Sequence, residues 1–237
     1  MKLAIFDIDG TLTNTNSVDD QCFVKALAEA HAITNINTDW ASYPHTTDSG
    51  IMAHVFQEKF GRDPRKTELG KFKSCFVKRL DEQYNSNSSG FDEIAGAAIA
   101  LERLKREPDW VIAVATGCWR ASALLKLRAA KIDIDGIPAA YAEDALSREA
   151  ILESAVSQSL ERYAQTSFGK IVSIGDGLWD VRTARRLGFD FLGVGSGQAA
   201  AMLHKAGAKH VVEDFADYNK LINVLNEAET PTVECLT

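Results

Sequence analysis

The feature that most constrains the fold of this chain is a series of short apolar runs, each ending in a small or acidic residue. They lie at 3–8, 111–115, 171–174 and 191–194. Runs of this length, rich in β-branched and aromatic residues, are typical of strands buried on both faces of a parallel sheet. Amphipathic stretches separate them, at 119–131, 147–163 and 179–188. This alternation predicts an α/β fold with a doubly wound, Rossmann-like parallel sheet.

The stretch after the first apolar run has a different periodicity. From about 15 to 88, apolar residues recur at helical spacing and no strand-like run occurs. Polar segments at 13–17 and 85–90 bracket this stretch, and such segments are typical of hinges or linkers. We therefore predict a core domain made of 1–14 and 89–237, with an all-helical domain, 15–88, inserted after the first strand.

Composition excludes several classes of protein. The 237 residues are 46% hydrophobic, with only 16 Gly and 5 Pro, which argues against disorder and against collagen. The 33 Asp and Glu outnumber the 26 Lys and Arg, for a net charge of −7, so a general binder of nucleic acid or of an anionic membrane is not expected. No segment approaches a secretory leader or a membrane span, and we expect a cytoplasmic protein.

The cysteines do not suggest a disulfide framework or a zinc site. They stand far apart, with no CxxC pair and no histidine at ligand spacing. The four positions are Cys22, Cys75, Cys118 and Cys235.

Acidic and hydroxyl residues follow three of the predicted strands. They are Asp7 and Asp9, then Thr116 beside Gly117, then Asp176 and Asp180. Because ligands of open parallel sheets bind off the carboxyl ends of the strands, we expect these residues to converge, with Gly10 supplying the turn after the first strand. Four carboxylates in one crevice would repel one another unless a cation lay among them, and Mg²⁺ prefers such oxygen ligands. The sequence therefore predicts a magnesium site.

Three other motifs are excluded by spacing. A calcium-binding EF-hand loop needs an acid five residues before its glycine, where this chain has Ile5. A Walker A motif is missing from the sequence. The glycines at 175 and 177 resemble a dinucleotide fingerprint, but Asp180 stands at the third glycine position and would face a pyrophosphate.

Taken together, the motifs resemble those of the haloacid dehalogenase (HAD) superfamily, in particular its phosphoglycolate phosphatase-like members. The matching segments are DIDGTL at 7–12, Thr116-Gly117, and GDGLWD at 175–180. The helical insertion resembles the C1-type cap of that family, so the resemblance covers essentially the whole chain.

The resemblance implies a role for each acidic residue. Asp7 is expected to be the nucleophile that attacks phosphorus, and Asp9 the general acid that protonates the leaving oxygen and then activates water. The presence of Asp9 points to phosphate-ester chemistry, because the dehalogenase and phosphonatase branches lack a second aspartate. Mg²⁺ would be held by the Asp7 carboxylate, the Asp9 backbone carbonyl and Asp176, with Asp180 as a ligand or a support.

The family also implies groups that hold the phosphoryl oxygens. Thr116 and Gly117 are expected to do so together with amides at the start of the next helix. A cation, usually lysine, precedes the strand that carries the GDG motif. Arg148, opening the predicted helix 147–163, is the best match, because Lys170 lies at the beginning of a strand and so at the wrong edge of the sheet.

Substrate choice is expected to lie in the cap. The polar segment 43–48 resembles the specificity loop of C1 caps, so His45 and Thr47 are candidate substrate contacts. Thr47 or Asp48 is alternatively an N-cap of the helix that follows. A site closed by a small cap favours a small phosphorylated metabolite as substrate.

The sequence thus predicts a Mg²⁺-dependent phosphatase that hydrolyses a small phosphate monoester through an aspartyl-phosphate. One alternative is a phosphomutase of the β-phosphoglucomutase type. Another is a non-catalytic signalling module that accepts phosphate on an aspartate. A monomer and a homodimer both remain open.

Overall fold

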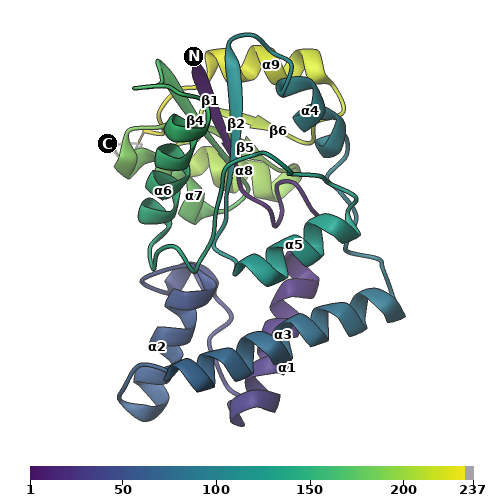
Figure 1. Cartoon of the computed structure of the whole chain (residues 1–237), viewed down its shortest axis with the longest axis vertical. Coiled ribbons are helices and arrows are strands. Elements are labelled where there is room, and N and C mark those ends of the chain that lie inside the picture. The colour runs from purple at the N-terminus through teal and green to yellow at the C-terminus, as the bar shows by residue number, and fades with distance from the viewer. Residues whose placement is uncertain (233–237) are drawn as a thin grey trace.

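A computed structural model describes residues 1–232. Its centre is a six-stranded sheet of order β3-β2-β1-β4-β5-β6, in which every pair of neighbours is parallel (Figure 1). The strands are β1 (Lys2–Phe6), β2 (Trp110–Ala115), β3 (Ala139–Ala140), β4 (Lys170–Gly175), β5 (Asp190–Val194) and β6 (His210–Val212). The prediction of a doubly wound parallel sheet is confirmed. The edge strands β3 and β6 were not predicted, because two or three residues carry no readable periodicity.

Helices cover both faces of the sheet. They are α4 (Ala97–Leu104), α5 (Arg120–Ala129), α6 (Arg148–Arg162), α7 (Leu178–Leu187), α8 (Gly197–Lys205) and α9 (Tyr218–Glu227). Alternate residues of β1 point to opposite faces: Ala4 and Phe6 pack in a cluster with residues of α4, α5 and α9, whereas Leu3 and Ile5 pack with residues of α6. α7 packs beside α6 and α8. Both faces of β1 are therefore buried, as expected for a central parallel strand.

The segment between β1 and α4 is helical, as predicted, and lies beyond one end of the sheet, in the lower half of Figure 1. It contains α1 (Asn16–His31), the short 3₁₀ helix η1 (Trp40–Ser42), α2 (Asp48–Phe60) and α3 (Lys66–Ser86). Phe23 lies at its centre and makes edge contacts with Phe72 and Phe76. Trp119 and Leu125 join the same apolar cluster. The helical segment therefore packs directly on α5 and the loop before it.

Two further observations bear on the predictions. Among residues 1–232, no helix combines the length and the apolar character needed to cross a membrane. Cys22 and Cys118 are buried free thiols and Cys75 is a partly buried one. Cys235 lies outside the described residues.

Candidate active site

The turn after β1 brings the first acidic motif against the neighbouring strand end. Gly10 has a φ of +72°, in the left-handed region that glycine adopts without steric cost. A Cβ at this position would lie 1.9 Å from Oδ2 of Asp176, so a larger residue would collide with that carboxylate. Because β1 lies between β2 and β4, Asp7, Thr116 and Asp176 follow three adjacent strands. The turn at Gly10 and the convergence of the strand ends are as predicted.

Three carboxylates form one group at this edge of the sheet. Oxygens of Asp7, Asp176 and Asp180 lie within 4.8 Å of one another. Oδ2 of Asp176 accepts a hydrogen bond of 2.8 Å from Nδ2 of Asn16. Oδ1 of Asp7 and Oδ1 of Asp176 are buried and have no hydrogen-bond partner within residues 1–232. Burying such oxygens without partners is costly, and an oxygen-only donor set suits a hard divalent cation. This group can therefore hold a metal ion.

The pKa shifts of these three carboxyl groups also favour a metal ion at this position. Burial raises the pKa of Asp7, against the opposing effect of Arg148. Burial and the negative charges of Asp180 and Asp7 raise the pKa of Asp176 well above its ordinary value. Burial also raises the pKa of Asp180 to about 7, although Arg148 opposes the shift. A divalent cation among these carboxylates would relieve both their desolvation and their mutual repulsion.

Arg148 lies in this crevice, at the start of α6. Its Nη1 donates a hydrogen bond of 2.7 Å to Oδ1 of Asp180 and lies 3.5 Å from Oδ2 of Asp7. Its Nε donates to the carbonyl oxygen of Thr46, at 2.8 Å. Ser147 is the N-cap of α6 and accepts a hydrogen bond from a helix amide, which positions the first helical residue. The structure therefore brings Arg148 to the acidic group and to the inserted helical segment at once.

Lys170, the other candidate cation, lies away from the crevice. It begins β4, where its Nζ pairs with Oδ2 of Asp190 at 2.8 Å. Since the carboxyl end of β4 carries the acidic group, Lys170 is at the opposite end of the strand, as predicted.

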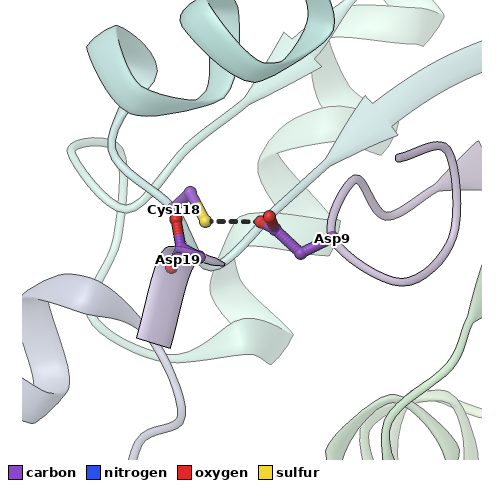
Figure 2. A group of neighbouring side chains, drawn as sticks. All are labelled: Asp9, Asp19 and Cys118. Carbon is purple, nitrogen blue, oxygen red and sulfur yellow. Dashed lines mark hydrogen bonds between the residues drawn. The ribbon is translucent and has the colours of Figure 1, made fainter. Parts of the chain in front are cut away.

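The expectation that four carboxylates meet in one group is wrong for Asp9, whose side chain belongs to a second group, with Asp19 and Cys118. The reason is that Lys126, from a helix distant in sequence, binds this carboxylate. Figure 2 shows the side chains of Asp9 and Cys118 directed toward each other, with Asp19 of α1 beside them. Sγ of Cys118 donates to Oδ2 of Asp9 at 2.9 Å, and the Thr15 hydroxyl donates to Oδ1. Nζ of Lys126, from α5, lies 2.6 Å from Oδ2 of Asp9 and 2.7 Å from Oδ1 of Asp19. Both oxygens of Asp9 therefore have partners.

This second group resembles a metal site in composition only. Asp9, Asp19 and Cys118 offer ligand atoms within 4.8 Å of one another, but the ammonium of Lys126 already bonds to all three. Burial alone would raise the pKa of Asp9, but Lys126 and the hydrogen bonds from Cys118 and Thr15 together lower it below its ordinary value. Burial would lower the pKa of Lys126, but Asp19 and Asp9 raise it well above its ordinary value. The lysine therefore supplies the positive charge of this group.

The loop after β2 lies against both groups. Oγ1 of Thr116 is buried and accepts a hydrogen bond of 3.2 Å from the amide of Cys118. A Cβ at Gly117 would lie 2.9 Å from Nη2 of Arg148 and 2.9 Å from the carbonyl oxygen of Thr46. Glycine at 117 thus leaves the guanidinium room to enter the crevice.

The amides at the start of α5 are already bonded, which differs from the expectation that they face phosphate. The amide of Trp119 donates to Oδ2 of Asp48 at 2.8 Å, and that of Arg120 donates to Oε2 of Glu143 at 2.9 Å. The amide of Asp48 in turn donates to the carbonyl oxygen of Gly117, at 2.8 Å. These carboxylates cap the helix from other parts of the chain, an arrangement that local sequence does not reveal.

The predicted specificity segment is docked onto the core. The Thr47 hydroxyl donates to the carbonyl oxygen of Leu146 at 2.8 Å and accepts from the amide of Gly50 at 3.0 Å, so Thr47 is the N-cap of α2. Oγ of Ser49 donates to the carbonyl oxygen of Ala142 at 2.7 Å. The alternative in which Thr47 caps the helix is thus confirmed.

A cavity of about 220 Å³ lies between the core and the inserted helices. Thr47, Gly117 and Arg148 line it, with the second acidic group and Trp179. His45 does not; it lines an adjacent recess of about 60 Å³. Four of the predicted site residues thus line this cavity: Asp9, Thr47, Gly117 and Arg148. Within residues 1–232, its lining does not include the other five, which are Asp7, His45, Thr116, Asp176 and Asp180.

Sequence reasoning missed Lys126 and Asp19. Lys126 is three residues after Ala123 and four before Ala130, both of which are buried in the core, so it stands on an apolar stripe of its helix. A lysine in such a position was the available signal, because a buried lysine requires anionic partners. Which carboxylates supply them depends on the fold.

The comparisons with known proteins agree with this architecture. A family model described as haloacid dehalogenase-like hydrolase matches residues 1–188, and the chain belongs to that family. A hydrolase from Pseudomonas syringae has a similar fold, with a TM-score of 0.70 and 23% identity over 96% of this chain and 99% of that one. None of the curated proteins compared with the chain matches it.

Two other solved structures show the same fold. A putative β-phosphoglucomutase from Bacteroides vulgatus has a TM-score of 0.66 at 16% identity, over 96% of this chain and 89% of that one. A predicted phosphoglycolate phosphatase from Haemophilus somnus has a TM-score of 0.58 at 18% identity, over 94% and 98% of the two chains. The family resemblance inferred from the motifs is confirmed, and the chain is a hydrolase of the HAD-like family.

Proposed function

We propose that this protein is a Mg²⁺-dependent phosphatase that hydrolyses a small phosphate monoester through an aspartyl-phosphate on Asp7. The observation that carries the proposal is a pair of buried oxygens beside Arg148, Oδ1 of Asp7 and Oδ1 of Asp176, which have no hydrogen-bond partner among residues 1–232. Oδ1 of Asp7 is the oxygen that would bind a metal ion or phosphorus. Oδ1 of Asp176 would be a further oxygen ligand of the cation.

Asp7, Asp176 and the backbone carbonyl of Asp9 are the proposed holders of Mg²⁺. When bound, the ion would neutralise charge on the carboxylates and on the phosphoryl oxygens. Asp180 is proposed as a support, because Oδ1 accepts from Arg148 and Oδ2 from the amide of Gly177, at 2.7 and 2.9 Å. Both carboxylate oxygens of Asp180 are therefore already hydrogen-bonded to neighbouring groups.

The chain's own residues would carry the two half-reactions. A carboxylate oxygen of Asp7 forms a bond to phosphorus while the bond from phosphorus to the leaving oxygen breaks. Asp9 gives its proton to that leaving oxygen. It later takes a proton from a water molecule, whose oxygen bonds to phosphorus as the bond from phosphorus to Asp7 breaks and inorganic phosphate leaves. Thr116, Gly117 and Arg148 are the proposed contacts of the phosphoryl oxygens.

Residues 15–88 are proposed to act as the cap of this site. This proposal is supported by Thr46, Thr47 and Ser49, whose polar groups are hydrogen-bonded to the core beside the cavity. Such closure would exclude bulk water and limit the substrate to a small phosphorylated metabolite. Thr47 and His45 remain proposed substrate contacts, Thr47 in the cavity wall and His45 from the adjacent recess.

Release of inorganic phosphate from a panel of phosphorylated metabolites, with and without Mg²⁺, tests the proposal. We expect turnover of a small phosphate monoester by the wild-type protein and none by Asp7→Asn. Full turnover by Asp7→Asn would show that the nucleophile is assigned wrongly. No turnover of any panel member, nor of p-nitrophenyl phosphate, would favour the signalling alternative.

A phosphomutase remains the second candidate, because it would use the same two aspartates and a cap. It predicts isomerised sugar phosphate in place of free phosphate. Following both products in one reaction separates these two candidates.

A further inference from the structure

Lys126 is a buried lysine to which the proposed mechanism assigns no role. Its side chain is 0% exposed. The ammonium donates to Oδ2 of Asp9 at 2.6 Å, to Oδ1 of Asp19 at 2.7 Å and to Sγ of Cys118 at 3.1 Å. Each of its three N–H groups therefore has an acceptor, which fixes both the ammonium and the groups around it.

These partners belong to different parts of the molecule. Asp9 lies in the turn after β1, Asp19 in the first turn of α1 within the proposed cap, and Lys126 on α5 of the core. Asp9, Asp19 and Cys118 also line the cavity of about 220 Å³. The ammonium thus joins a cap helix to a core carboxyl group at the wall of the cavity.

The two oxygens of Asp9 are held unequally. In the part of the chain that the structure describes, Oδ2 accepts from a buried ammonium and a thiol, whereas Oδ1 accepts only from the hydroxyl of Thr15. A charge-assisted hydrogen bond to a buried ammonium is stronger than one from a neutral hydroxyl. Oδ1 is therefore the oxygen that can exchange its partner for a substrate atom while Oδ2 stays in place.

We propose that Lys126 is a positioning residue for Asp9. It anchors Oδ2, so that Oδ1 faces the leaving group, and it ties this orientation to α1 through Asp19. This inference rests on the proposed phosphatase function. In the first half-reaction the proton on Oδ1 passes to the leaving oxygen as the bond from that oxygen to phosphorus breaks and Asp7 bonds to phosphorus. Lys126 lowers the pKa of Asp9 in the free protein, and the negative charge of a bound phosphate ester opposes that effect, so Oδ1 carries its proton in the complex.

Substrates whose leaving groups differ in their need for a proton distinguish a positioning role of Lys126 from a merely structural one. p-Nitrophenolate leaves without being protonated, whereas an alkoxide does not. The alkyl substrates are phosphate esters that the wild-type protein hydrolyses, with glycerol 1-phosphate among those tried. In Lys126→Met we expect kcat for these substrates to fall about 100-fold, which is within the range of general acid catalysis. kcat for p-nitrophenyl phosphate should fall less than about tenfold. Equal losses on both substrates would overturn the proposal.

Lys170→Met is the matched control. Lys170 is also mostly buried, with 19% of its side chain exposed, and it pairs with Asp190 at 2.8 Å away from the crevice. Its removal should leave the ratio of the two kcat values unchanged. A shift in that ratio equal to the one in Lys126→Met would show that loss of any buried lysine produces it.

Asp19→Asn tests the tie to the cap and serves if Lys126→Met does not fold. It keeps Lys126 and Asp9 but removes the charge on the cap side, so we expect the same preferential loss on alkyl phosphates, smaller in size. An unchanged ratio would contradict the link to α1. Absence of wild-type turnover would refute the phosphatase function and this inference with it, whereas equal losses in an active enzyme refute only the role of Lys126.

Discussion

Nη1 of Arg148 lies 2.7 Å from Oδ1 of Asp180, and the two side chains are 12% and 6% exposed. Breaking a buried pair leaves an uncompensated charge, so we expect Arg148→Met to lower the free energy of unfolding by about 3 to 5 kcal/mol and to abolish turnover. Arg148→Lys keeps the charge but loses the forked contacts, and should recover stability more than activity. Urea unfolding and kcat/KM measure the two effects.

The control for this prediction is Arg186→Met. Arg186 pairs with Glu149, but 68% of its side chain is exposed, so its removal should cost less than about 1 kcal/mol. A cost as large as that of Arg148→Met would argue that the position of Arg148 is not special.

Mg²⁺ should stabilise the folded protein through the group of Asp7, Asp176 and Asp180. A ligand that binds only the folded state raises its stability, by about 2.7 kcal/mol at a concentration of 100 times Kd. We expect the Tm to rise with Mg²⁺ in the wild-type protein and much less in Asp176→Asn, which removes a carboxylate whose Oδ1 has no hydrogen-bond partner within residues 1–232. Asp92→Asn, at an exposed position, should respond like the wild type. An equal rise in both variants would place the ion elsewhere.

The hydroxyl of Thr47 should matter first for stability. It caps α2 and bonds to Leu146, so Thr47→Ala is expected to lower the free energy of unfolding by about 1 kcal/mol, whereas Thr47→Ser retains the oxygen and most of the stability. Denaturant unfolding of both variants checks this. A stable Thr47→Ala protein with a raised KM would instead assign the hydroxyl to the substrate.

Glu68 should make the inserted helical segment sensitive to acid. Hydrogen bonds from Arg62 and from the amide of Arg65 lower the pKa of Glu68 from 4.5 to about 2. The unfolded chain therefore binds the proton first, and the stabilising contribution of Glu68, present above pH 4.5, is lost as the pH falls to about 2. Urea unfolding should show a larger difference between the wild type and Glu68→Gln at pH 6 than at pH 3. Glu153→Gln, at an exposed position of α6, makes the same chemical change and should show no such trend.

Much of the fold and part of the site were predictable from local patterns. The period of the apolar residues distinguished strands from helices, because each strand of a parallel sheet buries both faces and each helix buries one. The spacing of Asp7, Asp9 and Gly10 predicted a tight turn at a strand end. This is a local property, because glycine adopts the left-handed φ of the turn without steric cost. The edge strands β3 and β6 were too short to leave such a pattern.

The chain by itself determined the alternation of strands and helices, the helical insertion and the order of the acidic motifs, because these depend on neighbouring residues. Tertiary structure alone decided the partners of the buried charges. Lys126 and Asp9 are 117 residues apart, and Arg148 and Asp180 are 32 apart. A buried lysine or arginine needs an anionic partner, and this much follows from the sequence. The packing of α5 selects the carboxylates that Lys126 meets, and the packing of α6 selects those that Arg148 meets.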